Sequence, residues 1–220
     1  HGGLIMLRRL MSMAGTQPTY NAWDPLKKAS TVTLSNNNRT AAMTAASSPT
    51  VLGVYGKSSG IYQVEHTIDA KSSAGALWLG VAYVTVTLSG DDFLTENLWA
   101  LGSSYNKTNN VGSSAFINGS DNWAIGSVIG MVIDIDNNTL KFYLNGVEHI
   151  YDPAGDPPPD TRIAGSNIMF VGSEYANWNT TVYPAFRVVT SGTGQVTTNF
   201  GDAPFAYPIT GAVPMHGPTT

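Results

Sequence analysis

Apolar and small polar residues alternate along most of the chain from Thr31 onward, and this period of two predicts half-buried β-strands. Clusters of Gly, Asn, Ser and Pro separate the alternating runs. The run at 76–88 is almost continuously apolar, as in a buried strand. The expected strands are 31–35, 51–55, 61–68, 76–88, 97–101, 128–135, 139–144, 147–150, 168–171, 183–189 and 196–200.

The segment 126–150 predicts a three-stranded antiparallel meander. An Asp-Asn-Asn cluster at 136–138 marks its first turn, because Asn tolerates a positive φ. The Asn-Gly pair at 145–146 marks its second turn, because a type I′ turn needs a positive φ at both central positions. Antiparallel strands without crossover helices predict an all-β fold, a two-sheet sandwich or a barrel.

The chain is expected to form one β-sandwich domain, residues 23–207, between two short arms. Residues 1–22 form the N-terminal arm, in which 4–13 has the apolar spacing of an amphipathic helix. The C-terminal tail, residues 208–220, continues a Pro-rich stretch. Either arm could pack on the domain or on a neighbouring subunit.

Composition and charge exclude several partners. Gly, Thr, Ser and Asn make up 82 of the 220 residues, while only 12% are charged and the net charge is −4. Binding along a phosphate backbone needs clustered Lys and Arg, so no nucleic acid is expected. Without cysteine there is no disulfide or thiolate chemistry. No apolar run approaches the roughly 20 residues of a membrane helix, so no membrane insertion is expected.

Catalytic and metal-binding patterns are weak. Of the four histidines, His1 and His216 lie in the arms, and His66 and His149 lie in or beside strands, where a structural role is favoured. No Gly-x-Ser-x-Gly elbow occurs, although the sequence alone does not exclude a Ser–His–Asp triad formed by distant residues. The acidic turn at 134–138 lacks the Gly and Glu of an EF-hand, and no compact acidic strand motif of a glycosidase is present. We therefore predict no enzyme, no cofactor and no metal.

Aromatic residues supply the candidate binding chemistry. Those in strand patterns are expected in the core, and those in or beside polar loops are candidate anchors for a peptide or a sugar. An alternative of equal weight is that each anchor only covers the base of its loop. The expected core comprises Trp78, Val81, Ile129, Val132, Phe142, Leu144, Phe186 and Phe200. The candidate anchors are Tyr105, Phe116, Trp123, Tyr175 and Trp178.

Several short motifs follow one another in a recognisable order. They are Gly-Ile-Tyr-Gln-Val-Glu at 60–65, Leu-Gly-Val-Ala at 79–82, the meander at 126–147, Tyr-Pro-Ala-Phe at 183–186 and Asn-Phe-Gly at 199–201. In this order they resemble the SPRY family over most of the chain. The resemblance implies a bent, concanavalin-like two-sheet sandwich. It also implies binding of proteins or peptides through loops at one end of the sandwich, without catalysis.

The composition also looks like that of phage head-decoration and tail-fibre proteins. We therefore expect a non-enzymatic binding and structural module on a bacteriophage virion. Its loops 102–122 and 151–180 would recognise a neighbouring virion subunit, a host protein or a surface glycan, and assembly as a homo-oligomer is compatible with this role. The alternative is a cytoplasmic SPRY adaptor that recruits one protein into a complex. A sugar-cleaving enzyme is a third, weaker hypothesis.

Overall fold

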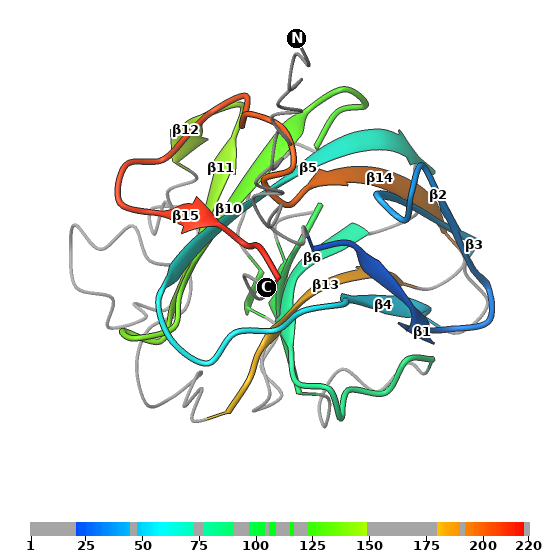
Figure 1. Cartoon of the computed structure of the whole chain (residues 1–220). Coiled ribbons are helices and arrows are strands. Elements are labelled where there is room, and N and C mark those ends of the chain that lie inside the picture. Colours follow the sequence, from blue (N-terminus) through cyan, green and yellow to red (C-terminus); the bar gives the residue numbers. More distant parts are fainter. Residues whose placement is uncertain are drawn as a thin grey trace, which may run out of the picture.

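Two antiparallel β-sheets pack face to face in the computed structural model of the chain (Figure 1). The predicted all-β, two-sheet sandwich is thereby confirmed, and no helix occurs in the described part of the chain. It follows that no described segment is a helix able to cross a membrane. The structure describes residues 21–44, 48–72, 77–89, 97–103, 106–108, 115–116, 123–148, 180–189 and 192–217, with the backbone alone at 106–108 and 115–116.

The first sheet, sheet A, has the strand order β1-β4-β13-β6-β7-β8-β9. Its strands are β1 (Trp23–Lys28), β4 (Thr50–Gly53), β6 (Leu77–Ala82), β7 (Leu98–Gly102), β8 (Asn106–Thr108), β9 (Ala115–Phe116) and β13 (Tyr183–Val188). Every residue of β6 is buried, as the continuous apolar run predicted. The strand is shorter than expected because the chain turns after Ala82, and Val86 and Leu88 then pack with Trp78 on the outer face of sheet A.

The second sheet, sheet B, has the strand order β12-β11-β10-β5-β14-β3-β2, with β15 beside β5. Its strands are β2 (Val32–Ser35), β3 (Thr40–Thr44), β5 (Ile61–Lys71), β10 (Val128–Asp134), β11 (Thr139–Leu144), β12 (Val147–Glu148), β14 (Thr193–Asn199) and β15 (Val213–Pro214). Consecutive β10, β11 and β12 confirm the predicted meander. β15 pairs with β5 in parallel, unlike the antiparallel ladders of the rest.

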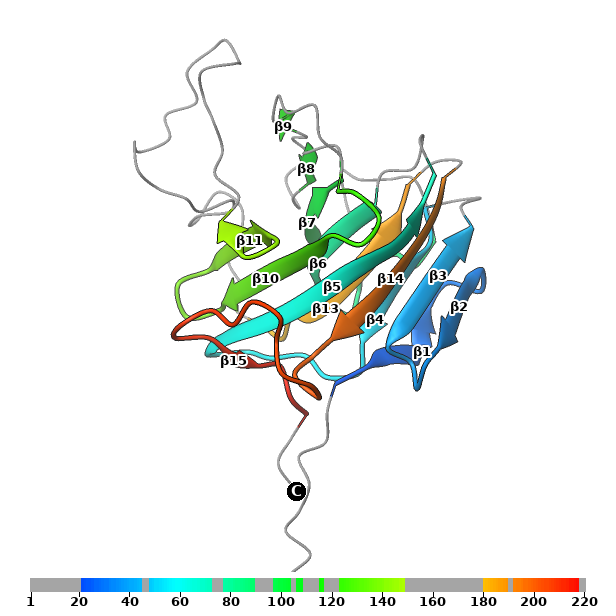
Figure 2. The ribbon, with the colours of Figure 1, turned by 90° about the horizontal axis from the view of Figure 1, so that it is seen from above.

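The first and last residues of β5 serve to name the two ends of the sandwich, the Ile61 end and the Lys71 end. Asp134, which closes β10, faces Ile61 in the sheet. A bridge between Lys57 and Val182 brings loops flanking sheet A to the same end. Figure 2 shows that β15 and both ends of the described chain also lie on this side of the molecule.

Trp23 joins the two sheets inside the core. Its ring stacks on His66 of β5 at a centroid distance of 5.9 Å and meets the ring of Phe200 edge-on at 5.3 Å. Phe186 of β13 lies 6.3 Å away, and all four side chains are buried. Residues from the N-terminal and C-terminal parts of the domain therefore pack in one aromatic cluster.

Every side chain predicted for the core is buried except that of Leu144, which is half-buried. Leu144 ends β11 and pairs with Val147 of β12, the last strand of sheet B in the described part of the chain. Val147 is 72% exposed, so little covers Leu144 from that side. The alternation along β11 correctly predicted that the Leu144 side chain points toward the core. Its position next to the last strand of sheet B limits its burial.

Residues 201–217 pack against sheet B, so the sandwich extends beyond residue 207, where the sequence placed its end. β15 takes a free edge of β5, because β14 pairs with β5 only from Glu65 onward. Met215, just after β15, is fully buried in the main core. The Pro-rich composition of 208–220 suggested a tail, but part of this segment packs against sheet B.

Some sequence predictions fall on residues outside the described part of the chain. These are the helical segment 4–13, the strand 168–171 and most of the arm 1–22. Five described strands, β1, β3, β8, β9 and β15, were not predicted. β1 contains Pro25 and an irregular register, and β3 consists of Thr, Ala and Met, so neither shows the aromatic and β-branched alternation of a typical strand.

The Asn-Gly hairpin is confirmed. Asn145 and Gly146 have φ values of 50° and 80°, and Leu144 pairs with Val147 directly across the turn. Asn145 also fixes the turn to the start of β10, since its Oδ1 accepts a hydrogen bond from the amide of Val128 at 2.9 Å. The turn therefore sets the register of β11 and β12.

Replacing Gly146 by alanine is expected to lower the free energy of unfolding by roughly 1–2 kcal/mol. A Cβ at this positive φ is strained, and it would lie 2.5 Å from Cδ1 of Tyr207, whose exposed ring would have to move. Gly126→Ala is the matched control, because Gly126 also has a positive φ of 88° but no atom within 4 Å of the added Cβ. Urea unfolding of both variants measures the difference; equal losses would show that Tyr207 does not constrain the turn.

Candidate functional site

At the Ile61 end, loop 54–60 lies between two tyrosines, each in contact with a lysine. The Lys57 Nζ atom lies 5.2 Å from the centroid of the Tyr62 ring, and the Lys27 Nζ atom lies 4.4 Å from that of Tyr183. Both distances are within the range of cation–π attraction. All four side chains are half-buried. Tyr62 packs against the main core between the sheets, and Tyr183 packs against the cluster on the outer face of sheet A, so the two pairs lie on either side of the loop. These four residues, from β1, β5, β13 and the loop, are called the Tyr–Lys platform.

The buried side chain of Asn21 fixes the first part of loop 54–60. Its Nδ2 donates to the carbonyl of Tyr55 at 2.8 Å, and its Oδ1 accepts from the amide of the same residue at 2.9 Å. One step further, the amide and carbonyl of Lys57 exchange hydrogen bonds of 2.9 and 2.8 Å with Val182. The backbone that carries Lys57 is therefore anchored to both flanking segments.

Two glycines let the loop pass close to its neighbours. A Cβ on Gly56 would lie 2.5 Å from Thr181 and 2.9 Å from the Cζ atom of Tyr183. Gly60 has a φ of 94°, which favours glycine, and its amide donates to Oδ1 of Asp136 at 2.8 Å. The loop is thus held at both ends and packed against a platform tyrosine, which gives the platform a fixed shape.

Burial affects both partners of the Lys57–Tyr62 pair. It lowers the pKa of Lys57, because the ammonium has lost part of its water shell. It raises the pKa of Tyr62, and the charge of Asp136 raises it further, so the phenol stays protonated and can donate a hydrogen bond. The second lysine is already compensated, since Lys27 Nζ lies 3.2 Å from Oδ2 of Asp24.

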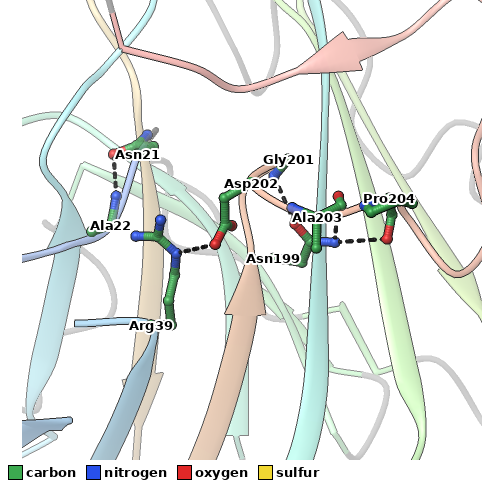
Figure 3. A network of polar contacts seen from close by, with 8 residues as sticks. All are labelled: Asn21, Ala22, Arg39, Asn199, Gly201, Asp202, Ala203 and Pro204. Atoms are coloured by element: carbon green, nitrogen blue, oxygen red, sulfur yellow. Dashed lines mark hydrogen bonds and ion pairs between the residues drawn. The ribbon is translucent and has the colours of Figure 1, made fainter. Parts of the chain in front are cut away.

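A polar network at the same end holds the turn that follows β14 (Figure 3). Arg39 pairs with Asp202 at 2.9 Å, which ties the β2–β3 hairpin to this turn. Oδ1 of Asn199 accepts from the amide of Gly201 at 2.8 Å, and Nδ2 donates to the carbonyls of 203–204 at 3.1 and 3.2 Å. The Asn-Phe-Gly motif therefore fixes the turn after β14, which is held to the β2–β3 hairpin.

Two outward-facing side chains of β5 hold the next residues of the chain. The carboxylate of Glu65 accepts hydrogen bonds from the amides of Ala206 and Tyr207 at 2.8 and 2.7 Å. Gln63 donates to the carbonyl of Tyr207 and accepts from the amide of Ile209, both at 2.8 Å. Glu65 is buried by this segment, so the glutamate of the Gly-x-Tyr-x-x-Glu motif holds residues 206–207 against β5.

The structure corrects one of the five predicted anchors. Trp123 is only 1% exposed and belongs to the main core, so its side chain packs and is not available to a ligand. Its position between polar Asp-Asn residues and β10 had suggested a loop anchor. Phe116 lies in β9, where only the backbone is described, and Tyr105, Tyr175 and Trp178 lie outside the described residues. These four remain predictions.

The two loops predicted to bind attach to the sandwich at different places. Loop 102–122 begins at Gly102, which pairs with the second residue of β6. Loop 151–180 leads into β13 at Tyr183, which pairs with the last residue of β6. Only the second loop therefore joins the sandwich beside the Tyr–Lys platform.

Sequence reasoning did not identify the platform. The sequence pattern places Tyr62 in a strand and indicates no role for Lys27 or Lys57. One available signal was the Gly-Lys-Ser-Ser-Gly run at 56–60, in which a basic residue stands in a short glycine-bounded loop. By itself this run does not identify a binding site. The structure shows that Tyr183 packs against the same loop.

The candidate catalytic and calcium residues have structural roles where the structure describes them. His66 is fully buried, and its Nδ1 lies 2.9 Å from the hydroxyl of Thr198. Asp134 accepts hydrogen bonds from the amide and side chain of Asn137 across the β10–β11 turn. Asp136 binds the amide of residue 60, as described above. These contacts use the side chains to fix turns and the core.

The fold is a two-sheet β-sandwich, and the Tyr–Lys platform lies at its Ile61 end. Residues 61–159 match the profile of the SPRY domain family. This match covers the centre of the chain and agrees with the resemblance of its motifs to the SPRY family. SPRY domains are generally non-enzymatic modules that bind proteins.

Two solved structures are similar over most of this chain. The SPRY domain of human HERC1 superimposes with a TM-score of 0.60 at 18% identity, over 83% of this chain and 100% of that domain. The structure of stonustoxin superimposes with a TM-score of 0.55 at 20% identity, over 82% of this chain but 27% of the toxin chain. At these identities both comparisons establish the fold alone. No curated protein sequence matches the chain.

Proposed function

We propose that this protein is a non-enzymatic module that binds a protein partner at the Tyr–Lys platform, with the adjoining loop 151–180 completing the site. The observation that carries the proposal is the fastening of loop 54–60 from two sides, by Asn21 and by Val182. A surface fixed before binding loses little conformational entropy when a partner arrives. Tyrosines on such a surface are frequent binding hot spots.

A random 12-residue peptide library, panned on the full chain, tests this proposal. Peptides recovered on the parent protein are expected to lose at least about tenfold in affinity on Tyr183→Ala or Tyr62→Ala, because an aromatic hot spot contributes about 2 kcal/mol or more. Tyr143→Ala is the matched control, since Tyr143 is also half-buried but lies on the outer face of sheet B. Circular dichroism and thermal unfolding confirm that each variant is folded. Failure to recover any specific peptide would contradict the proposal.

The predicted loop anchors enter the same assay as Tyr105→Ala and Trp178→Ala. If these residues anchor the ligand, each substitution weakens peptide binding by about tenfold or more. Salt should matter little to these contacts, because Lys107 and Arg162 are the only basic residues in the two loops. Parent-like binding by both variants would restrict the site to the platform and end the loop-anchor hypothesis.

We further propose, from composition, that the module is carried on a bacteriophage virion and recognises a neighbouring subunit, a host protein or a glycan. The supporting feature is the surface chemistry of a chain rich in Gly, Thr, Ser and Asn and poor in charge. The alternative is a cellular adaptor. Electron microscopy and a size measurement on the native source distinguish the two, because a virion component is found on particles and an adaptor in a small soluble complex.

A further inference from the structure

Lys57 and Lys27 of the Tyr–Lys platform differ in how their charge is compensated. Lys27 pairs with Asp24 at 3.2 Å and donates to the carbonyl of Val54 at 3.2 Å. Within the described residues, Lys57 has no carboxylate within ion-pair distance, and its Nζ contacts the Tyr62 ring. Its backbone is nevertheless fixed by Val182. The platform therefore presents one partly desolvated cation at a defined position.

Burial lowers the pKa of Lys57, which shows that the fold disfavours this charge in the absence of a partner. An anion brought to the site would restore the lost stabilisation. The neighbouring Tyr62 stays protonated and offers a hydroxyl donor to the same anion. A carboxylate can accept hydrogen bonds from both groups, because it has two acceptor oxygens.

Leu26 precedes Lys27 in β1 and exposes its apolar side chain. Its side chain is 90% exposed, and its amide donates to Oδ1 of Asp24 at 2.8 Å, which holds the irregular β1 backbone in place. An exposed leucine next to Lys27 is suited to an apolar residue of a partner. A ligand that satisfies the whole surface must combine a carboxylate with apolar or aromatic residues.

We propose that the Tyr–Lys platform binds an acidic segment of a partner protein, with a carboxylate at Lys57 and Tyr62 and apolar residues against Tyr183 and Leu26. This inference rests on the proposed function and specifies the chemistry of its ligand. It adds a recognition element at the Ile61 end to whatever the loops contribute.

The charges around the platform favour a short acidic segment over a nucleic acid. Asp24 pairs with Lys27, the charge of Asp136 acts on Tyr62, and Asp202 lies at the same end of the sandwich. A phosphate backbone would meet these carboxylates along its length, and it would find too few cations to offset them. A single carboxylate at Lys57 still meets the charge of Asp136 near Tyr62, but it brings one negative charge where a phosphate backbone brings several.

The experiment uses the 12-residue peptides recovered from the library as probes. Asp and Glu are expected to be enriched in them relative to the unselected library. Changing the critical carboxylate to its amide, or Lys57→Gln in the protein, is expected to weaken binding by about fivefold each, as for a partly exposed ion pair. Combining the two changes should cost little more than either one alone, because they remove the same contact. Lys57→Arg should retain binding.

Lys71→Gln is the matched control, because Lys71 is half-buried at the opposite end of β5. Raising the salt from 0.05 to 0.5 M should weaken the parent complex and leave that of Lys57→Gln nearly unchanged. Enriched peptides without acidic residues, or independent effects of the two changes, would overturn this inference and leave the proposed function intact. If a 12-nucleotide single-stranded RNA bound in a Lys57-dependent way and no acidic peptide did, the surface would be a nucleic-acid site instead. Recovery of no peptide would overturn both proposals.

Discussion

Replacing Phe142 by alanine is expected to lower the free energy of unfolding by about 3–5 kcal/mol, the usual cost of truncating a buried phenylalanine. Phe142 is 1% exposed and belongs to the main core, and its β11 backbone pairs with Met131 of β10, which is also fully buried. The substitution removes a ring from between the two sheets, and the fixed strands can close the cavity only in part. Urea unfolding at neutral pH measures the loss.

Lys141→Ala is the matched control for Phe142→Ala. Lys141 precedes Phe142 in β11, points to the other face and pairs with Glu148 at 3.1 Å on the surface. Loss of a surface ion pair of this kind costs about 1 kcal/mol or less. A loss below about 1 kcal/mol for Phe142→Ala would show that the inward face of β11 is wrongly assigned, because one residue of register exchanges the two faces.

The second large effect is expected on acidification. His66 is fully buried, and desolvation lowers its pKa to about 3 in the folded protein, against 6.5 for an ordinary histidine. The neutral ring stacks on Trp23 and contacts the hydroxyl of Thr198. Below pH 6.5 the unfolded chain takes up a proton on this residue and the folded protein does not. The contribution of His66 is therefore complete above pH 6.5 and decreases as the pH falls toward 3.

At pH 4.5 the parent is expected to have lost about 3 kcal/mol through His66, since each pKa unit corresponds to about 1.4 kcal/mol. His66→Gln removes this term, so its stability should be lower at pH 7 but should fall less between pH 7 and 4.5. Urea unfolding across that range measures both slopes, and acidic groups common to the two proteins cancel in the difference. Equal slopes would show that His66 does not control acid unfolding.

Local sequence chemistry was enough for much of the sandwich. The Asn-Gly pair at 145–146 specified its own turn, because few other residue pairs accept two positive φ values. The alternation along β11 specified that Phe142 points inward, and it is buried accordingly. Val132 of β10 was also expected in the core, but it lies beside Lys141 and Gln63 and is buried outside the main core. The continuous apolar run ending near Leu88 indicated burial on both faces but not the turn after Ala82. Polar residues such as Thr85 beside Val84 and Val86 could not be distinguished from strand positions.

Contacts between distant segments could not be predicted in the same way. Trp123 has polar neighbours in sequence and apolar neighbours in space, so its burial depends on where the chain enters β10. Met215 is buried because β14 leaves part of the β5 edge free, which no pattern near residue 215 reveals. In the sequence, Glu65 looks like an exposed strand carboxylate. It is buried because residues 206–207 pack over it and donate hydrogen bonds to it.

The sequence by itself therefore determined the strand content, the two-sheet class, the tight hairpin and the SPRY relationship, because each depends on the conformational preferences of neighbouring residues. Only the tertiary structure decided the candidate site. The Tyr–Lys platform draws Lys27, Lys57, Tyr62 and Tyr183 from segments up to 156 residues apart. Their contacts form where the two sheets meet loop 54–60. Long-range backbone hydrogen bonds set the positions of the rings and ammonium groups, and local conformational propensity does not specify such bonds.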